Sequence, residues 1–80
     1  MSISAADIQP LAVDVDCDDE HLQVSLADGR RISVPLTWCP RLEDASSREK
    51  KNWRLIGGGL GIHWEELDED ISVESLLRLR

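Results

Sequence analysis

Apolar and polar residues alternate along the first half of the chain, and this pattern predicts strands. Three stretches carry it, with apolar residues at Leu11, Val13, Val15 and Cys17, then at Leu22, Val24 and Leu26, and then at Ile32, Val34 and Leu36. A period of two places alternate side chains on opposite faces of a strand, so each stretch has one face for a core and one for solvent. We therefore expect a three-stranded antiparallel meander.

Turn signals separate these three predicted strands. Asp18-Asp19-Glu20 marks the first turn, and Asp28-Gly29 predicts a type I′ hairpin turn, which needs positive φ at both central residues. Pro35 has no backbone N–H, so the third strand should end there or lie at a sheet edge. Trp38 and Leu42 follow in a connector, and we expect them to pack over the open end of the sheet.

The second half of the chain begins with a helical pattern that runs into a glycine-rich stretch. Ser46 and Glu49 fit a capping box, which predicts a helix from Ser47 to Leu55 or Ile56. The glycines at 57–59 should end this helix as a C-cap. Apolar and other residues alternate again over 60–64, which predicts a short fourth strand.

The last part of the chain predicts an acidic turn and a helix. Glu65 to Asp70 should form a solvated turn, and Asp70 or Ser72 should cap a helix with apolar residues at Val73, Leu76 and Leu77. The predicted order β-β-β-α-β-α indicates a single small α+β domain over residues 1–80, with one layer of sheet and helices on one face. Residues 1–10 are predicted to be a flexible lead-in.

Charge and composition limit the classes of function. The chain has 80 residues and a formal net charge of −7, which disfavours nucleic acid and anionic membranes and favours a basic or neutral partner. It contains no run of about 20 apolar residues, as a membrane span requires, and no signal-peptide pattern at its start. Cys17 and Cys39 have no metal-site or disulfide-framework spacing. We therefore expect a cytoplasmic protein with reduced thiols.

Two motifs resemble ligand-binding motifs, but the residues around them do not support this interpretation. Gly57-Gly58-Gly59-Leu60-Gly61 lies after a predicted helix and before a predicted strand, the reverse of the order in phosphate-binding loops. Asp14-x-Asp16-x-Asp18 resembles the start of a calcium loop. Asp19, however, stands where that loop needs glycine, and Ser25 stands where it needs glutamate. We predict no cofactor from either motif.

One further set of residues could carry chemistry. His63, Asp68 and Asp70 could hold a divalent metal ion or act as acid and base. The structural alternatives are that the two aspartates cap the last helix, or that one of them forms a buried ion pair with Arg54. No nucleophile motif accompanies either histidine, so we assign no catalytic, cofactor-binding or metal-binding residue.

Several blocks of the chain resemble a small bacterial family, Domain of Unknown Function 2442. They are Leu-Ala-Asp-Gly-Arg at 26–30, Pro-Arg-Leu at 40–42, Asn-Trp-Arg-Leu-Ile-Gly-Gly-Gly at 52–59, Gly-Ile-His-Trp at 61–64 and Leu-Asp-Glu-Asp-Ile-Ser-Val-Glu-Ser-Leu-Leu at 67–77. Many members have proline where this chain has Glu65. The resemblance implies a fold but no activity, and the signature or interaction residues carried over are Trp53, Arg54, Gly57, Gly61, His63, Trp64, Asp68 and Asp70.

Three hypotheses about function follow. The first is a protein–protein interaction module rather than an enzyme, bound to another small protein that is basic or neutral, or to a second copy through a sheet edge. The resemblance implies an antitoxin-like or regulatory role of this kind. The second is a DNA-associated regulator that uses the basic residues of Arg48–Arg54. The third is a metal-dependent activity at His63, Asp68 and Asp70.

Overall fold

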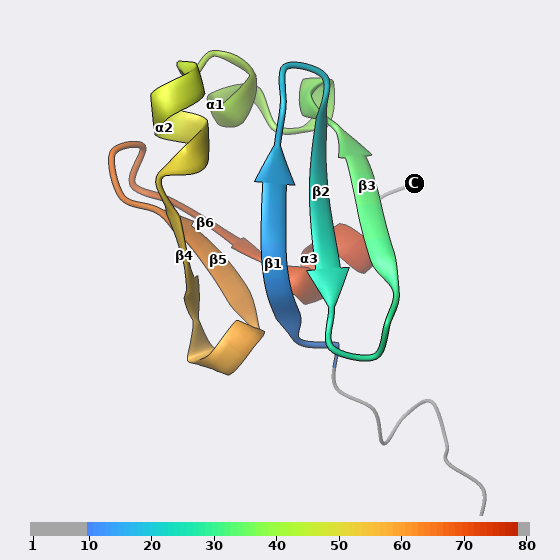
Figure 1. Ribbon diagram of the computed structural model, residues 1–80. Coiled ribbons are helices and arrows are strands. Elements are labelled where there is room, and N and C mark those ends of the chain that lie inside the picture. Colours follow the sequence, from blue (N-terminus) through green and yellow to red (C-terminus); the bar gives the residue numbers. More distant parts are fainter. Residues whose placement is uncertain (1–9, 79–80) are drawn as a thin grey trace, which may run out of the picture.

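The computed structural model describes residues 10–78, and most of the predicted lead-in at residues 1–10 lies outside them. The α+β class is confirmed (Figure 1). The strands are β1 (Ala12–Cys17), β2 (His21–Leu26), β3 (Arg31–Pro35), β4 (Trp53–Ile56), β5 (Gly61–Trp64) and β6 (Glu69–Ser72). The helical segments are η2 (Leu36–Trp38), α1 (Pro40–Glu43), α2 (Ser47–Lys51), η3 (Gly57–Gly59) and α3 (Val73–Arg78). Within residues 10–78 no helix has the length and apolarity needed to cross a membrane.

The strands form two antiparallel sheets of three, ordered β1-β2-β3 and β4-β5-β6. The prediction of a single sheet layer with helices on one face is therefore wrong. The core lies between the two sheets, because its buried side chains come from both of them (Figure 1). The completely buried side chains include Leu22 and Val24 from the first sheet, Ile62 and Trp64 from the second, and Leu42 from α1.

The first sheet is the predicted meander, with one change in β1. Val13 was expected in the core, yet it is 56% exposed while Ala12 is buried. The strand register explains this, because Ala12 pairs with Leu26 and Asp14 already pairs with Ser25. Val13 is thus the extra residue of a β-bulge, which reverses the inward and outward pattern on its N-terminal side.

The hairpin between β2 and β3 forms at Asp28-Gly29, but the predicted type I′ turn is wrong. Of these two residues only Gly29 has positive φ, at 95°. Its N–H donates to the Leu26 carbonyl at 3.0 Å, and the Leu26 N–H donates to the Arg30 carbonyl at 2.8 Å. This is the pattern of a three-residue loop in which a type I turn is followed by a left-handed glycine. β3 then ends at Pro35 and, among the described strands, pairs only with β2, as an edge strand should.

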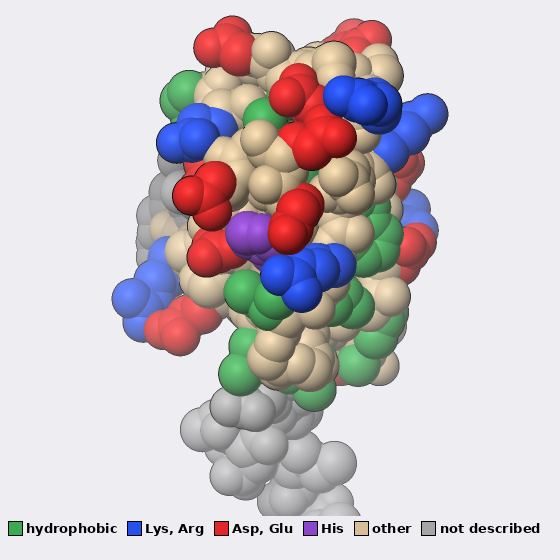
Figure 2. Space-filling view, turned by 90° about the vertical axis from the view of Figure 1, so that its left-hand side faces the viewer, with side chains coloured by type: hydrophobic (Ala, Val, Ile, Leu, Met, Phe, Trp, Pro, Cys, Tyr) green, Lys and Arg blue, Asp and Glu red, His purple; other side chains and the backbone are tan. Residues whose placement is uncertain are grey.

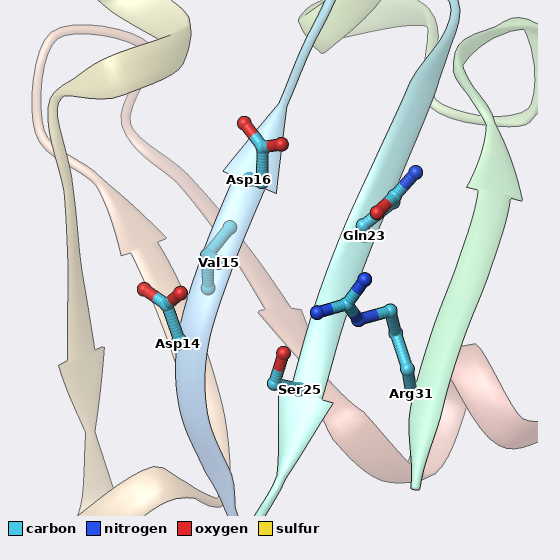
Figure 3. Close-up of a pocket in the computed structure, with 6 residues that line it drawn as sticks. All are labelled: Asp14, Val15, Asp16, Gln23, Ser25 and Arg31. Carbon is cyan, nitrogen blue, oxygen red and sulfur yellow. The ribbon is translucent and has the colours of Figure 1, made fainter.

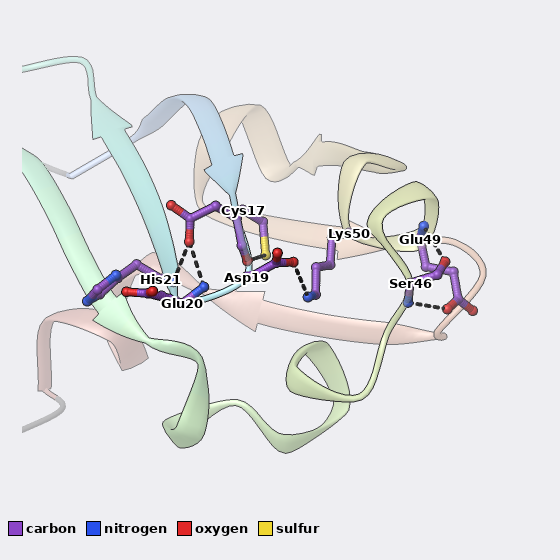
Figure 4. A network of polar contacts seen from close by, with 8 residues as sticks. Cys17, Asp19, Glu20, His21, Ser46, Glu49 and Lys50 are labelled. Carbon is purple, nitrogen blue, oxygen red and sulfur yellow. Dashed lines mark hydrogen bonds and ion pairs between the residues drawn. The ribbon is translucent and has the colours of Figure 1, made fainter.

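The predicted helix over 47–56 is half right. The capping box is present, since Ser46 Oγ accepts from the Glu49 N–H at 3.1 Å and Glu49 Oε1 accepts from the Ser46 N–H at 2.8 Å (Figure 4). The helix ends at Lys51, however, and residues 53–56 form strand β4. Pairing with β5 overrides the local helical pattern, because it places the inward residues of β4 against Trp64 and Ile62.

The glycine-rich stretch links β4 to β5 and is not the predicted helix C-cap. It forms the turn η3, in which Gly59 has φ of 109°. A Cβ atom at Gly59 would lie 2.5 Å from the Ala12 carbonyl oxygen, so the absence of a side chain at Gly59 lets η3 pack on β1.

The predicted acidic turn from Glu65 to Asp70 is only partly correct. Residues 65–68 form a turn, but residues 69–72 form strand β6. Strand β6 is stabilised by its pairing with β5 rather than by its own composition.

Trp64 ties the second sheet to α2 and to the first sheet. Its indole N–H donates to the Lys50 carbonyl at 3.1 Å, in the buried interior. Lys50 is itself buried along its length, and its Nζ lies 3.5 Å from Asp19 Oδ1 in the β1–β2 turn (Figure 4). The aliphatic stem of the lysine thus packs in the interior while its charge is near the surface.

Candidate functional site

The central residue of the candidate site is His63, on the outer face of the second sheet. The strand register places Arg54 of β4 and Asp70 of β6 opposite it on either side. His63 points away from the core, because Ile62 and Trp64 on either side of it along β5 have completely buried side chains. Arg54 and Asp70 are its cross-strand partners and lie on the same outer face. Figure 2 shows this face, where a histidine lies among acidic side chains with basic side chains near them.

Both ring nitrogens of His63 face carboxylates. Nδ1 contacts Asp70 Oδ1, and Nε2 lies 2.9 Å from Glu65 Oε2. The hydrogen bond to Asp70 raises the pKa of His63 above 6.5, and the negative charges of Asp70 and Glu65 add to this effect. Partial burial and the nearby Arg54 cation act in the opposite direction. The arrangement thus favours an imidazolium that holds β6 and the end of β5 together.

The predicted buried ion pair between Arg54 and Asp68 or Asp70 is wrong. Arg54 Nε lies 3.5 Å from Glu65 Oε2, and both side chains are largely exposed. His63 stands between Arg54 and Asp70 in the sheet, so the two do not pair directly. The result is a surface chain of charges running from Arg54 through Glu65 and His63 to Asp70, and exposed pairs of this kind contribute little stability individually.

The proposed metal ligands are only partly brought together. His63 and Asp70 are in contact, while Asp68 lies in the β5–β6 turn with φ of 49° and makes no ion pair with His63. No group of three or more histidine, cysteine or acidic side chains suited to a metal ion occurs within residues 10–78. Because each nitrogen of His63 already has a carboxylate partner, neither offers a free lone pair to a metal or a substrate.

The other signature residues lie in structural positions. Trp53 pairs with Trp64 across β4 and β5, where Trp64 is fully buried and Trp53 is half-buried. Gly57 belongs to η3, and Gly61 pairs with Ile56, whose Cγ1 atom would lie 3.2 Å from a Cβ at that position. Packing accounts for Trp53, Gly61 and Trp64, and a positive φ of 61° accounts for Gly57.

Comparison with known proteins now places the chain. Residues 12–80 match the family model described as "Protein of unknown function (DUF2442)". The chain belongs to the DUF2442 family. A solved structure described as a protein of unknown function from Rhodospirillum rubrum ATCC 11170 is similar, with 30% sequence identity, a TM-score of 0.76, and coverage of 89% of this chain and 88% of that one. No curated protein matches the chain.

The aspartates of the calcium-like motif serve different roles in this DUF2442 chain. Asp18 Oδ1 accepts from the backbone N–H groups of Glu20 and His21, each at 2.7 Å, and these bonds lower the pKa of Asp18 (Figure 4). Asp14 and Asp16 project from the outer face of β1 instead. The motif is therefore divided between a turn and a strand surface and does not form a loop around an ion.

The outer face of the first sheet is a charged surface that the sequence predicted only as solvent-facing. Asp14 and Asp16 of β1 lie on one side of a depression of about 290 Å³, and Arg31 of β3 lies on the other (Figure 3). Figure 3 shows the Arg31 guanidinium reaching across β2, above Ser25, toward β1. No ion pair joins Arg31 to either aspartate among the described residues, so both signs of charge remain available to a partner.

Trp38 also differs from its predicted place. We expected it to pack over the sheet together with Leu42, and Leu42 is indeed fully buried, yet Trp38 is 45% exposed. It lines a groove with Cys39 and Pro40 on one side and β6 and α3 on the other. In the sequence, this groove could be anticipated only from the position of Trp38 and Pro40 in a connector, after the alternating strand pattern has ended.

Proposed function

We propose that this DUF2442 chain acts as a protein–protein interaction module and that its partner is a basic protein. The observation that carries the proposal is an imbalance of unpaired charge on the described surface. Within residues 10–78, the carboxylates that form no ion pair with another described residue are Asp14, Asp16, Asp18, Glu20, Glu43, Asp44, Glu49 and Asp68. The cations of the same range that form none are Arg31 and Lys51. Such a field attracts a positively charged partner and speeds its association.

The basic residues that could have favoured DNA are largely neutralised. Arg48 Nη2 lies 3.3 Å from Glu66 Oε2, Lys50 is buried beside Asp19, and Arg54 belongs to β4 rather than to the helix. Only Lys51 of this set is without an acidic neighbour among the described residues. Since affinity for DNA depends on cations that are free to contact phosphates, this arrangement supports a protein partner instead.

The arrangement around His63 likewise supports binding rather than catalysis. A general base needs an unprotonated nitrogen near a substrate. Here both nitrogens meet carboxylates, and the raised pKa keeps the ring protonated at higher pH than an ordinary histidine. A regulatory or antitoxin-like role, as the family resemblance implies, would need only the surface and no catalytic group.

The test is to isolate the partner and then reconstitute the complex. The tagged chain is used to purify partners from its native host, with and without nuclease, and the recovered protein is expressed and titrated against the chain at low and high salt. We expect a basic partner that survives nuclease and associates more slowly at high salt. The Asp14→Asn/Asp16→Asn double variant should slow association, and Arg31→Gln, on the same face, should not. A chain that recovers no protein, or only nuclease-sensitive material, would refute the proposal.

A further inference from the structure

A groove beside β6 combines an apolar wall with an open backbone edge. Trp38, Cys39 and Pro40 form one wall, Glu69 and Ile71 of β6 form the other, and Leu76 of α3 lies at its end. The groove has a volume of about 220 Å³. Trp38 is the largest of the exposed hydrophobic side chains in residues 10–78. Tryptophan beside a groove is the kind of anchor that dominates binding energy in protein interfaces.

The edge of β6 has backbone groups that are directed away from its own sheet. The Val73 N–H donates to the Leu60 carbonyl at 2.9 Å, which fixes the alternation of hydrogen bonds along β5 and β6. Ile71 and Glu69 therefore bond to β5, while the N–H groups of Asp70 and Ser72 point outward. β6 pairs only with β5 among the described strands, so this edge can accept another strand.

The charge on the groove wall indicates what kind of strand would fit. Among the described residues that line the groove, Glu69 is the only charged one, and its side chain is mostly buried. Burial, to which the charge of Glu69 adds, raises the pKa of Cys39 on the facing wall. Its one cationic neighbour, Arg41, lies 3.6 Å away on an exposed side chain, so this ion pair is weak. A lysine or arginine of a ligand could therefore approach Glu69.

We propose that an extended segment of a partner protein, with an apolar residue and a basic residue two positions apart, binds in this groove as an additional strand beside β6. One apolar side chain lies against Trp38 and Leu76, the basic side chain that follows on the same face approaches Glu69, and carbonyl groups of the main chain accept from the outward N–H groups of Asp70 and Ser72. This inference rests on the proposed function, because it supplies a binding site for the basic partner proposed there.

A designed peptide tests the site without knowledge of the partner. Acetyl-Thr-Val-Thr-Lys-Thr-amide, in which valine and lysine lie on the same face of a strand, is titrated into the ¹⁵N-labelled chain, and backbone and indole N–H signals are followed by NMR. We expect shifts at Trp38, Ile71, Asp70 and Ser72, with saturation in the millimolar range or below. The same peptide with N-methylated backbone amides, and an acetyl-Thr-Val-Thr-Glu-Thr-amide peptide, should each bind at least tenfold more weakly, because the first lacks strand hydrogen bonds and the second has the wrong charge.

Two variants locate the binding. Trp38→Ala should weaken peptide binding at least tenfold, because it removes the apolar wall of the groove. Ser75→Arg should weaken binding by a similar factor, because it places a cation in the groove that repels the basic peptide. Leu60→Ala is the matched control, because Leu60 is 47% exposed but does not line this groove, and it should bind as the wild type does. Unchanged binding by both groove variants, or shifts confined to the outer face of the first sheet, would overturn the inference.

The outcomes also separate this site from the proposed function. A basic partner that binds Trp38→Ala and wild type equally would reject the groove and leave the interaction module intact. Peptide binding in the groove without any partner from the host would support the site and reject the proposed function. A concentration-dependent dimer joined β6 to β6, seen by sedimentation and by intermolecular NOEs, would show that a second copy is the occupant and overturn the proposal.

Discussion

The tight contact between η3 and β1 makes Gly59 the most sensitive glycine of the chain. A Cβ atom at Gly59 would lie 2.5 Å from the Ala12 carbonyl oxygen and 3.2 Å from Leu11 Cβ. It would also require a side chain at φ of 109°. The strained backbone costs about 1–2 kcal/mol, and overpacking that shifts backbone costs a further 1–3 kcal/mol, so we expect Gly59→Ala to lower the free energy of unfolding by about 2–5 kcal/mol. A domain of this size has a total of roughly 4–12 kcal/mol.

Gly58→Ala is the matched control for this prediction. Gly58 also has positive φ, at 68°, but a Cβ atom there would meet no atom within 4 Å. Only the backbone term applies, so its cost should be about 1–2 kcal/mol. Both variants replace glycine by alanine at adjacent positions with positive φ, so the additional cost at Gly59 reports mainly its close contacts with Leu11 and Ala12.

Urea unfolding followed by circular dichroism measures both variants. The two curves should have the same slope and different midpoints, since the surface exposed on unfolding is unchanged. The substitution Ala12→Gly should not rescue Gly59→Ala, because the closest contact is with the backbone oxygen of residue 12. Equal stability of Gly58→Ala and Gly59→Ala would show that η3 does not pack on β1 as described, and that the glycines serve only the turn.

Three further predictions concern groups in the core and on the second sheet. Because the pKa of His63 is raised in the folded chain, protonated His63 stabilises the fold below pH 6.5, and this stabilisation is lost as the pH rises through the folded-state pKa. The free energy of unfolding of the wild type should therefore fall between pH 6.5 and the folded-state pKa. The free energy of unfolding of His63→Gln should not fall in this way. Burial raises the pKa of the Cys17 thiol to about 11. Ellman's reagent should therefore modify Cys17 at pH 8 only as fast as the protein unfolds locally or globally. Rapid labelling of Cys17 without denaturant would contradict this prediction. Trp64→Phe should lower the free energy of unfolding in urea by about 2–4 kcal/mol, because it leaves a cavity and removes the donor to the Lys50 carbonyl. A decrease of less than about 1 kcal/mol would show that Trp64 does not pack as described.

The correct predictions were those that depend on neighbouring residues alone. The capping box at Ser46 and Glu49 is a local pattern, and it fixes where α2 begins. The meander of the first sheet follows from period-two patterns separated by short turns. The β-bulge at Val13 was missed because both Ala12 and Val13 are apolar, so the pattern allowed either residue to face the core.

The wrong secondary-structure predictions over 53–56 and 69–72 depend on pairing between distant residues. The stretch at 53–56 reads Trp-Arg-Leu-Ile, which is too short to distinguish the helical period from that of a strand. The stretch at 69–72 has one apolar residue, Ile71, and resembles a loop until it is paired with β5. The candidate site shared this difficulty, because the contacts of His63 with Asp70 and Glu65 depend on the register of the β5–β6 hairpin, which the sequence does not show.

The fold accounts for most residues of the DUF2442 signature, and this directs the search for function elsewhere. Trp64 fills the core, Gly59 admits a close backbone contact, and His63 joins two strands. Single exposed apolar side chains are ordinary, and Val13, alone on its bulge, needs no further explanation. Trp38 differs from Val13 because it stands beside an open strand edge and a mostly buried carboxylate. These three features lie together in one groove, which is why we assign the binding of a basic strand to this place.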